Sequence, residues 1–514
     1  MTTTITRGKY VLVRADLAGD STVLTDGAVA QTDGRIVAVG SYEDLRAQYP
    51  DADVVGNGRQ FLMPGLVNAH HHGRGLSGLL LGQPDGGLET WINHAWGRRA
   101  VEPYNMMLYT LLNLIRTGTT TIMFNQSATA RHMVWDEAQA NLRALNQAGL
   151  RTAFSLAFKN QCYLVYGNDD DVFSRMPDDL ASGVRGVIEG SVVSDEDYFG
   201  MTADLIRNYP VDSTNMVRVL YSPQSYHWAD EDTLGHIAEL ARAANVGIHT
   251  HCVESYYQRL YAERLHGEGQ TPTRRLHELG FLGPKTSFAH GVWLTEEDIA
   301  LMAETGTSIS HNPSSNLRLR SGIAPVLEMH RQGVHVALGT DSTSINDDDD
   351  LFQEMALAMR LHRPPGLEVP HLSSHQVLHM ATLGGAYETT FGEDMIGSLE
   401  VGKRADMVLL DWDRISTPYV AENLDVLDVL VSRARAVDVD TVIVEGSPIF
   451  EDKQFRTIDA PAVVEAVREE LGTPEPEDLT HRRDLAARLE PYLRDYYADW
   501  PVPEQPSYHY QSLG

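Results

Sequence analysis

A run of three histidines follows a short apolar segment near residue 66. In a β-strand, side chains at positions i and i+2 face the same way, so His70 and His72 would point together while His71 points away. Two imidazole groups side by side at a strand end are well suited to binding a divalent metal ion. The run therefore predicts a metal site that includes His70 and His72, although a histidine cluster without function is an equal reading of these residues alone.

A second histidine pair lies in the segment from residue 248 to 254. His249 and His251 would share one face of the expected strand, and His251 lies nearer its carboxyl end. Barrel enzymes place their chemistry at that end of the strands. We therefore assign His251 as a metal ligand and His249 to a supporting or packing role. Glu254 follows the strand, where its carboxylate could reach a water molecule at the metal.

Two further apolar segments end in His290 and Asp341. Four separate strands would then each deliver a metal-binding or proton-transferring residue to one end of a barrel, which chance explains poorly. Three neutral imidazoles and one carboxylate suit zinc, with iron, manganese or cobalt as alternatives, and such an ion can lower the pKa of water towards ~7. We expect one metal ion per chain, because the expected fourth strand, within residues 217–227, offers no lysine that could be modified to bridge a second ion.

The elements that position these residues form a regular series between residues 61 and 341. Eight short apolar segments alternate with longer helical patterns, which predicts an α/β fold, a (β/α)8 TIM barrel. The short, turn-rich strands at both ends of the chain predict one small β-sandwich, because neither piece alone could bury a face. The predicted domains are listed in chain order: residues 1–62, the first part of the sandwich; 63–394, the barrel; 395–455, the second part of the sandwich; and 456–514, a C-terminal extension.

The C-terminal extension is acidic and contains several prolines, tyrosines and tryptophans. A disordered tail is one interpretation. A docked tail, at a subunit contact for example, is the other, because aromatic side chains are enriched where surfaces meet. The sequence leaves both open.

Composition excludes several partners. The 514 residues carry a formal net charge of −30, which argues against nucleic acid and anionic membranes. There are only two cysteines, so a reducing compartment is expected. No signal peptide or transmembrane segment is recognisable. We therefore predict a cytoplasmic protein whose partner is a small-molecule substrate.

Two other patterns are given structural interpretations. Residues 73–78 match GxGxxG, but no acidic residue follows at the spacing of a dinucleotide site, so we favour a flexible loop over the metal. The acidic run from Asp347 to Asp350 is expected to cap a helix beginning near Leu351.

Several motifs of the sequence resemble those of a known family. The motifs, in order, are PGLVNAHHH, HTHCVE, FAHGVWL, SHNPSSNLRLRSGIAPV, LGTDS and GSLEVGKRADMVLLD. Together they resemble the amidohydrolase superfamily, in particular its branch of cytosine deaminases, S-adenosylhomocysteine deaminases and triazine chlorohydrolases. The resemblance extends from about residue 8 to 455.

The resemblance implies roles for individual residues. The four positions that match the family's metal ligands are His70, His72, His251 and Asp341, and Asp341 also helps to activate water. Glu254 matches the proton shuttle, and His290 matches the histidine that polarises the substrate. Family habit also implies a homodimer or a homotetramer.

Substrate contacts are expected from loops beyond the strands. The candidates are Trp91, Gln224, His227, His311 and Asn316. The segment GLLLGQPDGGLETWI keeps Trp91 but departs from the arginine-bearing segment that many deaminases of this branch have. Gln224 and His227 also differ from the pattern of nucleoside deaminases. Both departures weaken an adenosine-type interpretation.

The predicted function is hydrolysis of non-peptide C–N bonds, with deamination of a nitrogen heterocycle preferred. An amide, carbamate or urea hydrolase, or a chlorohydrolase acting on a xenobiotic-like molecule, would use the same site. A non-catalytic structural protein of this family ranks last, because such proteins typically lose the metal ligands that are retained here.

Overall fold

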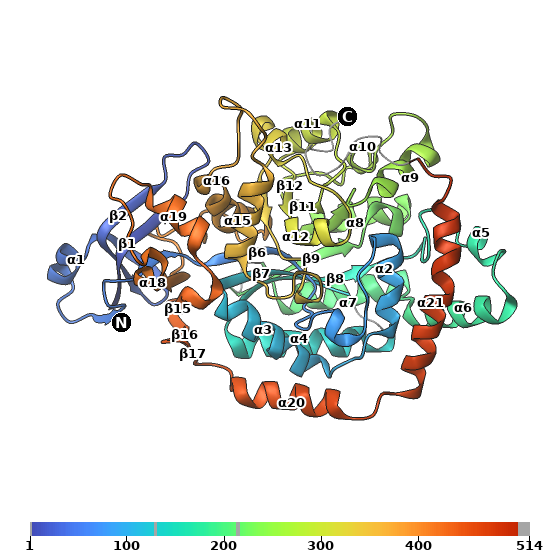
Figure 1. Cartoon of the computed structure of the whole chain (residues 1–514), viewed down its shortest axis with the longest axis horizontal. Helices are drawn as coiled ribbons and strands as arrows, with labels where there is room; N and C mark the ends of the chain where they lie inside the picture. Colours follow the sequence, from blue (N-terminus) through green and yellow to red (C-terminus); the bar gives the residue numbers. More distant parts are fainter. Residues whose placement is uncertain (1–2, 128–130, 212–215, 502–514) are drawn as a thin grey trace.

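The computed structural model describes residues 3–127, 131–211 and 216–501. Its centre is a sheet of eight parallel strands whose neighbours follow the order of the sequence (Figure 1). The strands are β6 (Leu66–His71), β7 (Thr119–Gln126), β8 (Arg151–Phe158), β9 (Val217–Pro223), β10 (Gly247–Cys252), β11 (Thr286–His290), β12 (Ser308–His311) and β13 (Val336–Leu338). This sheet confirms the predicted barrel.

The barrel closes between its first and eighth strands, beside the residues singled out from the sequence. The backbone N–H of His72 donates to the carbonyl of Asp341 at 2.9 Å, and the N–H of Asp341 donates to the carbonyl of His70 at 3.0 Å. Gly339 lies so close to His70 that a Cβ atom there would be 2.8 Å from its backbone nitrogen. Closure therefore brings these strand ends together directly.

Helices surround the barrel (Figure 1). The longer ones are α2 (Leu88–His94), α3 (Pro103–Arg116), α4 (Val134–Ala148), α6 (Asp178–Ser191), α7 (Asp195–Asn208), α8 (Glu231–Ala244), α9 (Tyr256–His266), α10 (Pro272–Glu278), α11 (Glu296–Thr305), α13 (Val326–Gln332) and α15 (Leu351–Leu361). Shorter ones are α5 (Asp170–Phe173), α12 (Pro313–Arg318), α14 (Thr343–Asn346), α16 (Ser374–His379) and α17 (Gly385–Glu388). No helix of the described ranges is long and apolar enough to cross a membrane.

Side chains at the helix ends explain where several of these helices begin. Asp350 accepts a hydrogen bond from the N–H of Phe352 at 3.0 Å, so the acidic run caps α15 as the sequence predicts. Thr295 and Asp298 form a reciprocal capping box at the start of α11. Such caps satisfy backbone donors that have no partner within the helix.

A second, mixed sheet joins the two ends of the chain. Its strands are β1 (Thr3–Arg14), β2 (Thr22–Thr32), β3 (Arg35–Ser41), β4 (Asp53–Val55), β5 (Phe61–Pro64), β14 (Met407–Leu410), β15 (Val439–Val444), β16 (Ser447–Glu451) and β17 (Gln454–Phe455). β5 and β14 pair antiparallel, from Phe61 opposite Leu410 to Pro64 opposite Met407. Helix α1 (Tyr42–Gln48) packs on β2 and β3, α18 (Trp412–Ser416) follows β14, and α19 (Val426–Arg433) packs against α15 and α16. The small sandwich is thus built from both chain ends.

A buried ion pair connects the barrel to this sandwich. Arg151, the first residue of β8, donates to both carboxylate oxygens of Asp406 at 2.9 and 3.0 Å. It also donates to Glu445 at 2.6 Å. A bidentate pair of this kind fixes relative orientation, and removing one partner of a buried pair typically costs ~3–5 kcal/mol.

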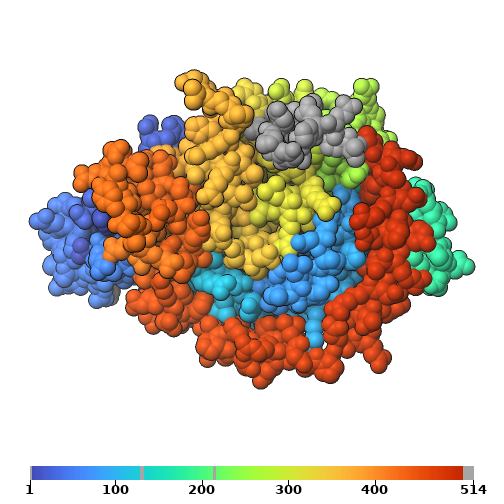
Figure 2. Space-filling model, in the orientation of Figure 1, coloured from blue at the N-terminus to red at the C-terminus, as the bar shows by residue number. Residues whose placement is uncertain are grey.

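The C-terminal extension packs on the outside of the barrel. Helices α20 (Ala460–Gly472) and α21 (Glu477–Tyr497) run along its periphery (Figures 1 and 2). In α21, Leu485, Leu489, Leu493 and Tyr497 recur every four residues and are buried. The extension therefore docks within its own chain as far as Pro501, and residues 502–514 lie outside the described residues.

Candidate active site

Three histidines and an aspartate converge where the barrel closes. Asp341 Oδ1 lies 3.5 Å from His70 Nε2 and 3.3 Å from His72 Nε2. His72 Nε2 in turn lies 3.2 Å from His251 Nε2. All four groups come from the carboxyl ends of strands β6, β10 and β13 or from the residues directly after them. The structure therefore brings together the four residues that the sequence predicted as metal ligands.

Backbone carbonyls orient two of these imidazole rings. His72 Nδ1 lies 2.9 Å from the carbonyl oxygen of Asn125, and His251 Nδ1 lies 2.6 Å from that of Gln224. A carbonyl can only accept, so each Nδ1 carries the proton. Each Nε2 of the neutral ring therefore presents a lone pair, and the two lone pairs face each other across 3.2 Å. Such supporting bonds are the usual way that proteins orient metal-binding histidines.

His70 is supported by a chain of buried groups. Its Nδ1 lies 2.8 Å from His249 Nε2, and His249 Nδ1 lies 2.7 Å from Ser287 Oγ. Glu388 Oε1 lies 4.0 Å behind His249. His249 thus contacts a metal-site residue from behind and does not itself enter the convergence of Nε2 atoms.

The electrostatics of the four residues match those of a cation site. Burial lowers the pKa of His70 to about 3 and that of His251 well below its usual range, so both rings are neutral. Burial alone would raise the pKa of Asp341, but its interactions with His70 and His72 keep it well below the usual range. Within the described residues, His70 Nε2 and Asp341 Oδ1 are buried without a hydrogen-bond partner. Neutral nitrogen ligands around one carboxylate fit a divalent metal ion.

Glu254 and His290 lie on the other side of the same carboxylate. His290 Nε2 is 3.8 Å from Glu254 Oε2 and 4.0 Å from Asp341 Oδ2. Ser315 Oγ donates to Asp341 Oδ2 at 2.6 Å. Burial, followed by the charges of Asp341 and Glu89, raises the pKa of Glu254 well above its usual range. A carboxyl group tuned in this way is suited to carrying a proton.

The backbone is strained at these strand ends. Val253, His290 and Asp341 have φ angles of 41°, 76° and 65°, in the left-handed region that non-glycine residues rarely adopt. Each such conformation costs on the order of 1–3 kcal/mol and persists where surrounding contacts enforce it. The positive φ angles of His290 and Asp341 thus mark where regular strand conformation ends at the mouth of the barrel.

The candidate substrate residues occupy different places. Trp91, on α2, packs with Leu88, Leu319 and Ile345. Gln224 supports His251 through its carbonyl oxygen, and its side-chain Nε2 lies 3.4 Å from Ser127 Oγ.

The other three predicted substrate residues are His227, Asn316 and His311. His227 is buried, and its ring lies 4.3 Å from that of Tyr166. Asn316 Oδ1 lies 2.8 Å from His290 Nδ1, so it holds that ring in place. His311 Nε2 lies 3.1 Å from His362 Nε2, so this side of the ring already has a partner.

A polar cluster beside the metal residues, formed by Glu89, Tyr166 and Tyr497, was not predicted from the sequence. Glu89, on α2, accepts a hydrogen bond from Ser255 Oγ, and burial raises its pKa. Tyr166 is also close enough to hydrogen-bond to Glu89, and it accepts a bond from Gln258 Nε2 at 3.3 Å. The backbone N–H of Tyr166 donates to the hydroxyl oxygen of Tyr497, on α21, at 3.0 Å. The only sequence signal for this cluster is the position of Glu89, two residues before Trp91.

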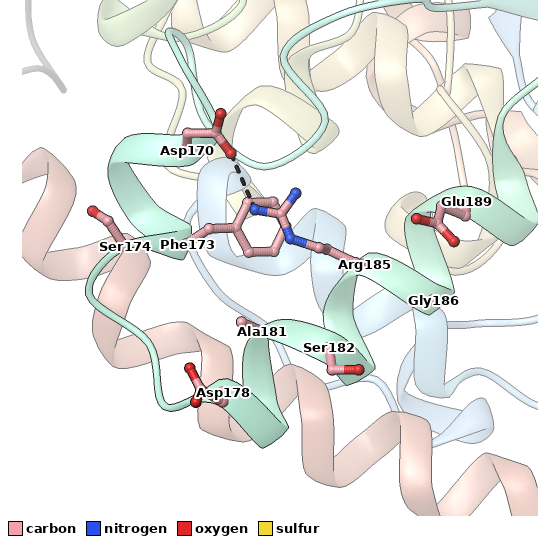
Figure 3. Close-up of a pocket in the computed structure, with 9 residues that line it drawn as sticks. All are labelled: Asp170, Phe173, Ser174, Asp178, Ala181, Ser182, Arg185, Gly186 and Glu189. Carbon is pink, nitrogen blue, oxygen red and sulfur yellow. Dashed lines mark hydrogen bonds and ion pairs between the residues drawn. The ribbon is translucent and has the colours of Figure 1, made fainter.

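A surface groove of about 810 Å³ lies elsewhere, between α5 and α6 (Figure 3). Its cation, Arg185, already pairs with Asp170 at 3.1 Å and lies 3.8 Å from the centre of the Phe173 ring. None of the converging histidines or carboxylates lines it. The chemistry of the molecule is therefore at the barrel mouth and not in this groove.

Comparison with known proteins agrees with this geometry. The model of the amidohydrolase family matches residues 61–449, and a bacterial imidazolonepropionase-like composite domain matches residues 27–52. The chain is 30% identical over 467 residues to a 5'-deoxyadenosine deaminase of Methanosarcina mazei, covering 90% of this chain and 96% of that protein. It is 28% identical over 476 residues to a 5-methylthioadenosine/S-adenosylhomocysteine deaminase of Thermodesulfovibrio yellowstonii, covering 90% and 97%.

Two solved structures resemble the whole fold. A zinc-bound adenosine deaminase from Xanthomonas campestris superposes with a TM-score of 0.76 at 27% identity, covering 91% of this chain and 97% of that one. A zinc-bound atrazine chlorohydrolase from Arthrobacter aurescens superposes with a TM-score of 0.77 at 22% identity, covering 91% and 99%. The second similarity concerns the fold alone.

The fold and the site define a metal-dependent hydrolase with a barrel-mouth centre. The chain belongs to the amidohydrolase family. It is an enzyme that acts on C–N bonds other than peptide bonds in small molecules, with a divalent metal ion.

Proposed function

We propose that this enzyme deaminates a nitrogen heterocycle and that its metal is one zinc ion. The observation that carries the proposal is the clustering of three imidazole Nε2 atoms, those of His70 and His72 beside Asp341 and that of His251 beside His72. Glu254 and His290 lie across the same carboxylate. Two relatives of similar length are named as deaminases of adenosine derivatives, and the similar adenosine deaminase structure contains zinc. Both facts favour ammonia as the leaving group.

In this proposal the zinc ligands are His70, His72, His251 and Asp341. When bound, the ion supplies a water molecule of lowered pKa. The hydrogen bonds of His72 and His251 to backbone carbonyls hold their rings before the ion arrives, so little reorganisation accompanies binding. The absence of lysine from β9, in the fourth strand position, favours a single ion.

Glu254 and His290 complete the chemistry around the reacting carbon. Glu254 accepts a proton as water adds to the sp² carbon and returns it to the nitrogen that leaves as ammonia. A C–O bond forms, the C–N bond to the amino group breaks, and the ring carbon that carried the amino group becomes a carbonyl carbon. His290, held by Asn316, stabilises the charge that develops on the ring during attack. The residues that we place around the substrate are Trp91, Gln224, His227, His311 and Asn316.

The decisive experiment joins metal analysis to leaving-group analysis. Purified enzyme is reconstituted with zinc, iron, manganese or cobalt, and ammonia release is measured on a panel of aminated purines, pyrimidines, pterins and triazines. We expect about one metal ion per chain and ammonia release from at least one heterocycle. Two tightly bound ions would contradict the single centre. Release of amine or chloride without ammonia would instead indicate the amide, carbamate, urea or chlorohydrolase alternatives.

Three further predictions concern the whole protein. We propose a homodimer or homotetramer in the cytoplasm, with domain limits at residues 62, 394 and 455. Sedimentation analysis and cell fractionation test the first two. Limited proteolysis tests the domain limits. The strand nearest the limit at residue 62 is β5, which ends at Pro64, and the strand nearest the limit at residue 455 is β17, which ends at Phe455.

A further inference from the structure

Two arginines lie beside the metal residues with few partners of their own. Arg74 follows His72 by two residues, and Arg98 follows the short helix Ala95–Gly97. Within the described part of the chain, Arg98 Nε and Nη2 are buried and have no hydrogen-bond partner. The guanidinium carbon of Arg98 lies 5.2 Å from the centre of the Trp91 ring. The ring thus supports one face of the guanidinium, while the N–H groups of Nε and Nη2 have no partner among the described residues.

Contacts of α2 place Arg98 at the barrel mouth, because its neighbour Trp91 packs with Ile345, four residues after Asp341, and Glu89 of the same helix contacts Ser255, directly after Glu254. Burial lowers the pKa of Arg98 well below the usual range, and the positive charge of Arg74 lowers it further. The negative charge of Asp341 acts in the opposite direction. Both charge interactions, with Arg74 and with Asp341, agree with a position of Arg98 at the barrel mouth.

Arg74 is only partly neutralised by its surroundings. Its Nη2 lies 3.4 Å from the carbonyl oxygen of Ser127, at the end of β7. Glu137 acts on Arg74 electrostatically, but no ion pair within 4.0 Å joins a carboxylate to Arg74 or Arg98 among the described residues. Two half-buried like charges without a close carboxylate among the described residues are unfavourable, because charges removed from water need pairing and hydrogen bonds.

Other arginines of this chain show the contrast. Arg151 is fully buried and makes two hydrogen bonds to Asp406 and one to Glu445. Arg318 pairs with Asp85 and Asp347, each at 2.8 Å. Although the chain has 71 acidic residues, none within the described ranges forms an ion pair with Arg98.

We propose that Arg98, with Arg74 beside it, binds an anionic group on the substrate, a carboxylate or a phosphate. This inference rests on the proposed function, because it assumes that the reacting ring lies over Asp341. A guanidinium group presents paired N–H donors that match the oxygens of either anion. The substrate would then be anchored at both ends, with its ring at the metal and its anion at Arg98.

A matched set of substrates distinguishes a carboxylate from a phosphate as the anion that Arg98 binds. Adenosine, adenosine 5'-carboxylic acid and adenosine 5'-monophosphate share one ring and differ only in the group at the 5' position. The same neutral, carboxylated and phosphorylated series is prepared for whichever heterocycle the ammonia screen identifies. We expect the zinc enzyme to have a lower KM for one anionic member than for the neutral member.

The test variant is Arg98→Gln, and the matched control is Arg99→Gln. Arg99 lies on the same loop but is bound by the carbonyls of Glu470 and Thr473. Arg98→Gln should raise the KM for the preferred anion about tenfold or more relative to any change in the KM of the neutral member. Arg99→Gln should change neither value. Arg98→Lys keeps the charge and should retain part of the preference, and metal content verifies that each variant is folded.

The outcomes distinguish this inference from the proposed function. Equal effects of Arg98→Gln on neutral and anionic members, or no effect on either, would overturn it while deamination stands. If the zinc enzyme deaminates nothing in the panel, the proposed function fails for these substrates. Binding of inorganic phosphate and acetate is then measured by calorimetry. Affinity that falls about tenfold or more in Arg98→Gln supports the anion site, and unchanged affinity, or no binding to either enzyme, overturns it.

Discussion

The floor and the wall of this active site are built in different ways. The floor consists of side chains at strand ends, and nearly every one has a partner behind it, as His251 has Gln224 and His70 has His249. The wall comes from loops, α2 and the C-terminal helix α21, and it includes Arg98, whose Nε and Nη2 have no hydrogen-bond partner in the described part of the chain. A supported floor suits fixed chemistry, and an unsatisfied wall suits recognition of something that arrives. The difference suggests that substitutions in the floor abolish the reaction, while those in the wall change what is bound.

The largest effect is expected for Asp341→Asn. The change removes the one carboxylate to which His70, His72 and His290 are all close. Because metal catalysis supplies several kcal/mol, kcat/KM should fall by about 10³-fold or more, together with bound metal. Metal content and turnover measure both losses. Full activity with a full complement of metal would contradict the assignment of the floor.

A smaller loss is expected for Glu254→Gln, and it should separate chemistry from metal binding. Glutamine keeps the size of the side chain but cannot carry the proton. We expect kcat to fall by about 10²–10⁴-fold with metal content unchanged. Single-turnover kinetics measure the loss. A variant with nearly normal kcat would exclude Glu254 as the proton carrier, and one without metal would make it a ligand.

His249→Gln should lower the affinity for the metal, because His249 supports the ligand His70. His249 contacts His70 Nδ1 at 2.8 Å, so losing the imidazole leaves that ring less well oriented. Removing such a supporting group typically lowers metal affinity about 10–100-fold. Competition with a chelator measures it. His311→Gln is the control, because His311 is also a buried strand histidine but contacts His362. Equal losses of affinity in both variants would show that burial, and not support of His70, is responsible.

Much of the floor could be predicted because strands have a simple period. Alternation separates His70 and His72 from His71, whose Nε2 instead lies 3.2 Å from Asp349. Position along the strand separates His251 from His249. These inferences need only local geometry and the rule that parallel strands end on one face of a barrel.

The wall could not be predicted in the same way, because its contacts join distant parts of the chain. Tyr166 and Tyr497 are 331 residues apart, and nothing in either segment indicates the other. The sequence also did not indicate that Asn316, a predicted substrate residue, contacts His290. Arg98 carried no motif, and only burial without a partner distinguishes it from Arg99.

The smallest effect should come from Tyr497→Phe, which tests whether the C-terminal helix shapes the wall. The change leaves the buried N–H of Tyr166 without its acceptor, at a cost of about 1–3 kcal/mol in the free energy of unfolding. KM should rise by less than about tenfold while kcat and metal content stay constant, since the floor is untouched. Thermal unfolding and steady-state kinetics measure both changes. Tyr492→Phe, on the same helix, is the control, because the Tyr492 hydroxyl has no hydrogen bond to a described residue. A fall in kcat with constant KM would show that α21 acts on the chemistry of the floor, and the division between floor and wall would then be wrong.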